Sequence, residues 1–541
     1  MISTVKEQLF RVTTPSQYAG WRRGGLLLLL IPLAVHAQTW NEDFLNQPFN
    51  LRYSSASPTR IADNQVRDFA VGHVGYTFDR GSYHAIEQSD KAGELSAYIG
   101  GLKHIGNVDL QGHLRYRNIQ EKNQAWATAL WNLSENPFKL CDSIPGDAST
   151  ESFDMSATAA YAFNSRLRGA LEIGISTGSR ADQSDPRPRT TTSAIPINLG
   201  LDYSLGQAWK LGIAAGFQAF SSTVDYTNIL QSASNFYFIM KGMGDFQKRS
   251  TADYTSYHRD YTGVTWRGTL SAEFAPEDGN IADFLEVGYA TASENARDGS
   301  TSYEYKGGDY SQTNITLQDR LQIRSGKSLL HNVTLRADLL SGKATWYDQK
   351  RETDLEHGNI QYYRILGSNP VQKTQRLDAT LGYQLDILRE GQRDLYFALN
   401  ADLSNITRKH FLGSAVPKQS ISVVDIDVTA GKIFSIGKAS LLAQLNGGYA
   451  LPLTNDYASG SAPTSTDDIS ADFTRRVFEY ETASHAHVGL LADASLPAGK
   501  KLVVGVHANA NISLYTGSEE YWRGFDGHSR TRAEVGAYLK F

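Results

Sequence analysis

Residues 532–541, RAEVGAYLKF, place apolar and polar side chains on alternate positions. One parity carries Ala533, Val535, Ala537, Leu539 and Phe541, and the other carries Arg532, Glu534, Gly536, Tyr538 and Lys540. Because successive side chains of a strand point to opposite faces, this alternation predicts a strand with one apolar side. Such a strand is compatible with any half-buried sheet, so the kind of sheet has to be inferred from the rest of the chain.

Long segments of the same two-faced kind recur along the chain. The clearest is RLDATLGYQLDI (376–387), and comparable segments occupy residues 108–117, 166–176, 208–220, 262–274, 423–434 and 501–514. Each runs for ten or more residues, which is the length that a tilted strand needs to cross a bilayer. A soluble sandwich has shorter strands at closer spacing. The pattern therefore favours a transmembrane sheet.

The connections between these segments alternate between short and long. Tight turns are predicted at 104–107, 164–166, 205–208, 276–280, 324–328, 389–393, 435–438 and 497–500, and long connections at 122–150, 223–258, 348–371 and 453–481. Short turns at one rim and long loops at the other are typical of outer-membrane barrels, whose short turns are periplasmic. The eight tight turns imply nine hairpins, and hence about 18 strands, with about 14 as the lower bound.

We therefore predict an all-β fold, a transmembrane antiparallel up-and-down barrel over residues 69–541. Closure of the barrel removes the open edges that would invite aggregation. The last strand must then pair with the first, which we expect at residues 69–78. Residues 38–68 remain as a segment that lies either in the lumen or in the periplasm. Phe541 would lie at the periplasmic rim, where an aromatic ring suits a lipid interface.

Residues 1–37 have the features of an export signal peptide. Basic residues precede an apolar run from Leu26 to Val35, and Ala37 offers a cleavage point. The apolar run is ten residues long, whereas a membrane-spanning helix needs about 20. We therefore expect the mature chain to begin near Gln38 and to lie outside the cytoplasm.

The composition excludes some classes of protein. A single cysteine, Cys141, excludes an intrachain disulfide framework. A net charge of −5 with a pI near 6.2 gives no reason to propose nucleic acid as a partner. The mean hydropathy of −0.37 is compatible with a transmembrane barrel, because half of each strand faces a polar lumen.

Three features resemble those of known outer-membrane proteins. The apolar stripe that ends in Phe541 resembles the signature that outer-membrane barrels present to their assembly machinery. The motifs NPFKLCDSIPGD (136–147) and DPRPR (185–189) resemble those of an uncharacterised Bacteroidota family of outer-membrane barrels. Its members are commonly encoded near TonB-dependent receptors and surface lipoproteins. The resemblance implies a bacterial outer-membrane location, contact with membrane lipid, a setting in nutrient uptake and those two classes of partner, but no catalytic or binding residues.

Parity directs a set of charged residues into the lumen of the predicted barrel. They are His113, Arg115, Arg117, Arg166, Arg168, Asp425 and Asp427. Opposed charged walls would impose a field that selects solutes in a pore. The alternative, which we favour, is that these charges pair and fill a closed lumen, since charges that face each other in a polar interior tend to be compensated.

Three histidines share the inward parity near the end of the chain. His485 and His487 lie two residues apart on one strand, His507 lies on the next strand, and barrel closure would bring His73 near them. Imidazoles in such an arrangement can share a Zn, Cu, Fe or Ni ion. The favoured alternative is that a polar lumen simply accepts imidazole. Asp493 could join them only if the register brings it close.

The connection at 122–150 contains an apolar cluster with few charges. Its members are Trp126, Trp131, Phe138 and Cys141. Exposed, they would dock a partner lipoprotein or receptor. Folded inward, they would form a constriction, and the sequence leaves both interpretations open.

Two arginines alternate with prolines in DPRPR. Pro186 and Pro188 restrict the backbone, so Arg187 and Arg189 could be held rigidly towards an anion such as a lipopolysaccharide phosphate. The favoured interpretation is a stiff corner between strand and loop.

The sequence offers no positive sign of an enzyme. The zinc-hydrolase motif H-E-x-x-H is absent, and no nucleophile elbow is expected. We predict a non-enzymatic barrel without a cofactor that acts as a pore or accessory subunit in TonB-linked nutrient uptake. The alternative is a docking barrel that scaffolds a surface lipoprotein or receptor. Metal or haem handling by the luminal histidines is a third, less favoured hypothesis.

Overall fold

The computed structural model describes most of the chain. The described residues are 49–64, 68–229, 235–243, 245–252, 256–277, 279–300, 303–356, 358, 360–411, 417–458, 469–499, 501–517 and 527–541. The predicted signal peptide at 1–37 lies outside them, as does the first part of the predicted 38–68 segment. Within these ranges, no helix is long and apolar enough to cross a membrane.

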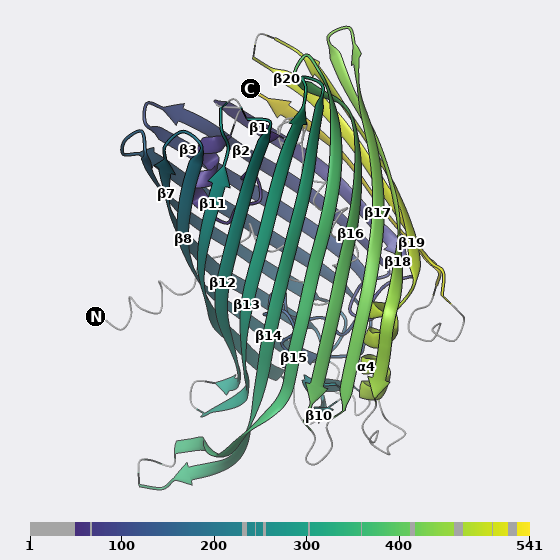
Figure 1. Ribbon diagram of the computed structural model, residues 1–541. Helices are drawn as coiled ribbons and strands as arrows, with labels where there is room; N and C mark the ends of the chain where they lie inside the picture. Colours follow the sequence, from purple (N-terminus) through teal and green to yellow (C-terminus); the bar gives the residue numbers. More distant parts are fainter. Residues whose placement is uncertain are drawn as a thin grey trace.

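The chain forms a closed antiparallel barrel of 18 strands (Figure 1). The first nine are β1 (Phe69–Gly81), β2 (Lys91–Ile105), β3 (Val108–Gln124), β5 (Gly146–Ala162), β6 (Leu167–Asp182), β7 (Pro188–Leu205), β8 (Trp209–Thr227), β11 (Ser256–Phe274) and β12 (Ile281–Ser300). The other nine are β13 (Tyr303–Ser325), β14 (Leu329–Asp354), β15 (Ile360–Arg389), β16 (Gln392–His410), β17 (Lys418–Ile436), β18 (Ala439–Ala458), β19 (His485–Pro497), β20 (Val503–Tyr515) and β21 (Ser529–Lys540). The predicted all-β fold and strand number are confirmed.

The barrel closes between its first and last strands. β1 pairs with β21 from Val71 opposite Lys540 to Gly81 opposite Arg530. Phe541 continues the ladder, because its backbone N–H donates to the carbonyl of Ala70 at 2.9 Å. The stretch 532–541 is thus the closing strand that its alternation predicts.

Alternation along each strand separates an apolar exterior from a polar interior. In β21, Val535 is 58% exposed on the outer face, while its neighbour Glu534 is 9% exposed on the inner face. Leu381 and Leu399 also have exposed side chains on the outside, whereas Asp386 is buried inside. Outward apolar and inward polar residues are the pattern that a strand adopts between lipid and a polar lumen.

The eight predicted tight turns fall between consecutive strands, all at one end of the barrel (Figure 1). The predicted long connection at 348–371 is wrong. β14 continues to Asp354 and β15 starts at Ile360, with Lys350 opposite Arg364. Because backbone pairing tolerates almost any side chain, these residues extend the ladder as a hairpin that projects beyond the barrel (Figure 1).

Several short elements lie inside the barrel. A 3-10 helix, η4 (Pro58–Asp63), lies against β5, β6 and β7. A separate three-stranded sheet combines β4 (Leu140–Cys141), β9 (Phe236–Gly242) and β10 (Asp245–Ser250). Helix α4 (Ile469–Glu481) follows β18. The inner sheet and α4 lie towards the long loops, whereas η4 lies towards the short turns (Figure 1).

Candidate functional site

The N-terminal segment, residues 49–64, lies on the inner wall near the short turns. η4 begins in a conventional way, since the Ser57 hydroxyl accepts the N–H of Thr59 at 3.4 Å and Pro58 occupies the first position. The wall makes room for it at Gly200, where a Cβ would lie 2.5 Å from Ser57 Oγ and 3.0 Å from Pro58 Cδ. A glycine is therefore required for this close approach.

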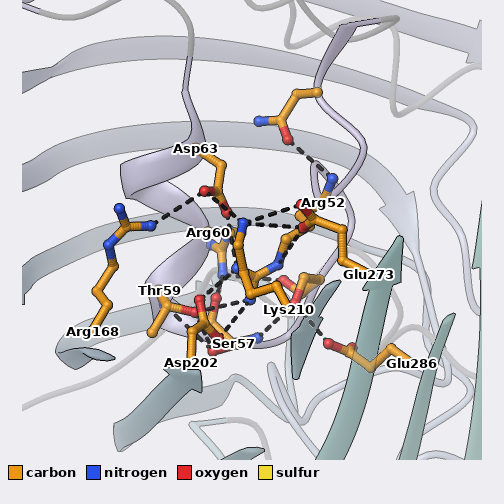
Figure 2. Close-up of polar contacts among 12 residues, drawn as sticks. Arg52, Ser57, Thr59, Arg60, Asp63, Arg168, Asp202, Lys210, Glu273 and Glu286 are labelled. Atoms are coloured by element: carbon orange, nitrogen blue, oxygen red, sulfur yellow. Dashed lines mark hydrogen bonds and ion pairs between the residues drawn. The ribbon is translucent and has the colours of Figure 1, made fainter. Parts of the chain in front are cut away.

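Arg52 fixes this segment to the wall (Figure 2). Its guanidinium donates to both carboxylate oxygens of Asp202 on β7, at 2.5 and 3.1 Å. It also donates to Asp63 at 2.9 Å and to the Thr59 hydroxyl at 2.9 Å. Arg52 is 2% exposed. A two-pronged arginine–carboxylate pair of this kind is among the strongest polar contacts in proteins.

Asp63 extends the contact to two further strands (Figure 2). Its carboxylate accepts from Arg168 of β6 at 3.3 Å and from Lys210 of β8 at 3.1 Å. Lys210 also donates to Glu273 of β11 at 3.1 Å. Burial alone would raise the pKa of Asp63, but the charges of Arg52, Lys210 and Arg168 hold that pKa below its usual value.

We call these six groups the luminal ion cluster. Its cations are Arg52, Arg168 and Lys210, and its anions are Asp63, Asp202 and Glu273. The charges balance, as expected for ionic groups removed from bulk water. Two members belong to the N-terminal segment and four belong to the wall, so the cluster links the segment to the wall by ionic contacts.

The backbone of the segment is bound as well. Glu286 of β12 accepts from the Ser55 hydroxyl at 2.6 Å and from the Ala56 N–H at 3.0 Å. Arg320 of β13 donates to the carbonyl of Asn50 at 3.0 Å. These contacts extend the attachment to strands beyond the cluster.

A second layer lies inside the barrel near the long loops. Trp126 and Cys141 pack with Phe238 of β9 and Phe473 of α4. Phe138 is buried in another apolar cluster, and Trp131 contacts the Phe220 ring of β8. All four predicted loop residues face inward, so they do not form an exposed docking surface.

One arginine ties this inner layer to the wall. Arg408 of β16 donates to Glu135 in the loop at 2.8 Å and to Glu481 of α4 at 2.6 Å. Burial would raise the pKa of Glu135, but the charges of Arg408 and Arg376 lower it to about 2. Glu135 is therefore a permanent anion that holds the loop in place at neutral pH.

Burial raises the pKa of two neighbouring groups in the same loop. Burial raises the pKa of Asp142 to about 6, although the Tyr226 hydroxyl and the Ile144 N–H both donate to its carboxylate. Burial likewise raises the pKa of the Cys141 thiol well above its usual value. Since the thiolate is the reactive form, Cys141 is an inert, structural cysteine.

The charged residues that were predicted to line the lumen do not form one group. Arg168 belongs to the luminal ion cluster. On β3, His113 contacts the Ser156 hydroxyl at 2.9 Å, Arg117 lies 3.6 Å from Asp154, and Arg115 lies over the Tyr98 ring. The prediction for Arg166 is wrong, because β6 begins at Leu167 and leaves the Arg166 side chain exposed in the turn.

The predicted histidine trio is split into two groups. Asp425, His485 and His487 form one, and His73, His507 and Glu534 form the other, with the potential ligand atoms of each group within 4.8 Å of one another. The reason is the register: His507 lies opposite Asp493, whereas His487 lies opposite Ser513. Asp493 itself accepts from the Tyr538 hydroxyl at 2.8 Å.

Asp427 joins the first histidine group. Its carboxylate lies 2.9 Å from His487 Nε2. Two of the predicted luminal charges, Asp425 and Asp427, are thus directed towards a histidine.

Two further sequence features lie outside these sites. The Arg187 and Arg189 side chains are exposed at the long-loop end of β7, and Arg187 pairs with Asp185 at 2.7 Å. The letters GISTG at 174–178 fit a nucleophile-elbow motif, but Ser176 is buried in the middle of β6. An elbow requires a sharp turn between strand and helix, so Ser176 has no such role.

Most members of the luminal ion cluster escape sequence analysis. Asp202 and Lys210 flank a predicted turn, which marks them as rim residues. Nothing in the sequence indicates that Arg52 returns into the lumen to meet them. Only the wall residues of the cluster carry a sequence signal, which is their inward parity.

One comparison with known proteins identifies a family, but no comparison identifies an activity. Residues 58–541 match a family described as a family of unknown function (DUF6850). No curated protein matches the sequence. The expected uncharacterised family is thereby found, while the Bacteroidota origin and the genomic setting stay predictions.

Several solved structures are similar. The ferric preacinetobactin receptor BauA of Acinetobacter baumannii is 10% identical with a TM-score of 0.39, over 88% of this chain and 80% of that one. The RagAB peptide importer in its closed-closed state is 7% identical with a TM-score of 0.41, over 88% and 87%. A Pseudomonas aeruginosa FadL homologue is 11% identical with a TM-score of 0.34, over 98% of both chains. At these identities the likeness concerns the fold alone.

Proposed function

We propose that this chain, which belongs to the family of unknown function DUF6850, is an outer-membrane barrel whose N-terminal segment gates a path for polar solutes. Because the family has no known function, the role of the chain is inferred from its own side chains. The observation that carries this proposal is the luminal ion cluster, which binds a separate piece of chain to the inner wall. The proposal has three parts: location, path and gate.

The location is supported by the outer wall. Apolar side chains such as Leu270, Leu381 and Val535 are well exposed around the barrel. In water a continuous apolar band of this kind would promote aggregation, whereas in a bilayer it matches the lipid. Fractionation with the outer membrane, and a heat-dependent shift of the detergent-solubilised protein on a gel, are the expected results.

The path is supported by the polar inner wall. Inward parity places carboxylates, guanidiniums, amides and imidazoles along the strands, as in barrels that conduct water and solutes. We therefore propose small polar solutes as the class that passes through the barrel.

The gate is supported by how the N-terminal segment is held. Ile61 and Ala62 pack against apolar wall residues. The segment is also held by ion pairs and hydrogen bonds, and these can be exchanged for water when the segment leaves the wall. The segment is bound near the short turns, which face the periplasm in such barrels. A periplasmic partner could therefore reach it, and the finer form of the proposal is a non-enzymatic role in TonB-linked nutrient uptake.

Conductance of the purified protein in planar bilayers tests the gate. We expect rare openings in the wild-type protein and frequent openings in Arg52→Ala. Arg187→Ala is the matched control, because it removes an exposed arginine outside the luminal ion cluster. Absence of conductance in both the wild-type protein and Arg52→Ala, at all voltages, would argue for a docking barrel.

One observation favours docking as a second candidate function. The projecting β14–β15 hairpin carries exposed apolar side chains, with Leu355 78% exposed and Ile360 and Leu366 also exposed. Exposed apolar groups on a hairpin beyond the barrel suit a surface lipoprotein or receptor. Co-purification of a partner from gently solubilised native membranes, lost in Leu355→Glu, would support this function.

A further inference from the structure

Asp425, His485 and His487 converge on one point of the inner wall. They are 3%, 3% and 2% exposed, and their potential ligand atoms all lie within 4.8 Å of one another. Asp425 comes from β17 and the histidines come from β19, with β18 between them. The group therefore joins two strands that are not direct neighbours.

The middle strand makes this convergence possible. Ala450 of β18 lies between Asp425 and His485, and Gly448 lies between Asp427 and His487. A Cβ at Gly448 would lie 2.4 Å from His487 Nε2 and 2.5 Å from the carbonyl oxygen of Ile426. The small residues leave room for the imidazole to reach across β18 to β17.

Each imidazole is oriented by a contact at one nitrogen. His487 Nε2 lies 2.9 Å from Asp427 Oδ2, so its Nδ1 is directed to Asp425, with 4.0 Å between Nδ1 and Asp425 Oδ1. His485 Nδ1 lies 3.1 Å from the carbonyl oxygen of Ala483, which leaves Nε2 for a ligand. A carboxylate or carbonyl behind the imidazole is the usual arrangement at protein metal sites, because it fixes the tautomer and the ring.

The facing atoms have no hydrogen-bond partner. Both carboxylate oxygens of Asp425 and the Nδ1 of His487 are buried and unsatisfied. Among the described residues, no lysine or arginine forms an ion pair with Asp425 or Asp427. Asp402 of β16 lies opposite Asp425 and adds a further carboxylate. A buried carboxylate that accepts no hydrogen bond destabilises the fold. The negative charge of these carboxylates therefore favours a bound cation.

We propose that Asp425, His485 and His487 bind one divalent transition-metal ion, with Zn²⁺ as the reference ion. Two imidazole nitrogens and one carboxylate oxygen suit this class of ion and leave a fourth position open. Ligand atoms around tetrahedral zinc lie about 3.4 Å apart. The 4.0 Å gap between His487 and Asp425 therefore closes with a small rotation of the Asp425 side chain.

The other histidine group differs in one respect. His73 Nε2 and His507 Nε2 lie 3.3 Å apart, within hydrogen-bond distance of each other. They can satisfy each other without an ion. His507→Ala is therefore the matched control for the proposed site, and the proposal does not depend on the gating function.

Metal binding to the purified full-length barrel tests the proposal. The detergent-solubilised protein is stripped with a chelator and titrated with Zn²⁺ alone, and the metal retained after gel filtration is measured. We expect one Zn²⁺ per barrel in the wild-type protein and in His507→Ala. Asp425→Asn and His487→Ala should each weaken binding at least tenfold, and Asp427→Asn should weaken it about 10- to 100-fold. Replacement by Co²⁺ should give a visible absorption spectrum that changes in Asp425→Asn.

Three results would overturn the proposal. The first is no retention of Zn²⁺, Co²⁺, Ni²⁺ or Cu²⁺ by the wild-type protein. The second is equal retention by the wild-type protein and by Asp425→Asn and His487→Ala. The third is loss of the ion in His507→Ala instead. The heat-dependent gel shift of each variant shows that its barrel is folded, so a loss of binding cannot be ascribed to unfolding.

Discussion

Arg52→Ala should release the N-terminal segment while the barrel stays folded. The substitution leaves Asp202 buried, at 3% exposed, without its guanidinium partner. Breaking a buried ion pair from one side costs about 3–5 kcal/mol. Asp63 still has Arg168 and Lys210, so we take the lower value. At about 1.4 kcal/mol per factor of ten, the released fraction should rise about 100-fold.

Thiol labelling measures this release. Ala62 of η4 is buried where the segment packs against the wall, and Ala62→Cys places a thiol there that reacts only when the segment leaves the wall. We expect labelling about 100-fold faster in Arg52→Ala, by the same free-energy conversion. Cys141 is the internal reference, because it is fully buried in the other layer. An unchanged rate at Ala62→Cys, or an equal rise at Cys141, would refute the reasoning, since the second result would indicate general unfolding.

Further predictions concern packing, pH and docking. Gly200→Val should also speed labelling at Ala62→Cys, because its side chain meets Ser57 and Pro58 while all charges remain; an unchanged rate would contradict the close fit. The pKa of Asp63 is lowered, so the carboxylate stabilises the bound segment above its unfolded pKa, and this stabilisation is lost only as the pH falls through the lower folded pKa. The labelling rate of Ala62→Cys should therefore be flat from about pH 6 to 8. At neutral pH it should rise in Asp63→Asn. Burial raises the pKa of Asp142 to about 6, so the stability that its protonated form gives the fold is complete below pH 3.8 and is lost as the pH rises through about 6. The free energy of unfolding should therefore fall by up to about 3 kcal/mol between these pH values. Asp142→Asn should remove this fall. Leu355→Glu should leave the conductance of the barrel unchanged. A change in conductance would indicate that the β14–β15 hairpin contributes to the solute path.

The fold was predictable because a barrel repeats one local rule. Alternation along each strand, as in 376–387, and the tight turns between strands depend on neighbouring residues only. The hairpin at 348–371 was missed because its first strand ends in the polar stretch DQKRETD (348–354), which lacks the apolar face that marks a membrane strand, although its backbone pairs.

The site was predictable only where parity was enough. Parity placed Arg168, Asp425 and His487 on the inner wall, but it could not give the partners of Arg52, which lies outside any strand. The histidine trio failed for a related reason, because the pairing register between β19 and β20 separates His507 from His487. Contacts across the lumen depend on how all 18 strands close, and no local pattern encodes them.

A reversible lock on the segment tests the gate most directly. The Cβ of a residue at Gly200 would lie 2.5 Å from Ser57 Oγ, which is too close for two unbonded side chains but close enough for a covalent link. Ser57→Cys and Gly200→Cys should therefore form a disulfide that fixes the segment to β7. Conductance is recorded for this pair in the Arg52→Ala background, first oxidised and then reduced. The gate predicts no openings when the disulfide is closed and frequent openings after reduction. Equal conductance in the two states would contradict it.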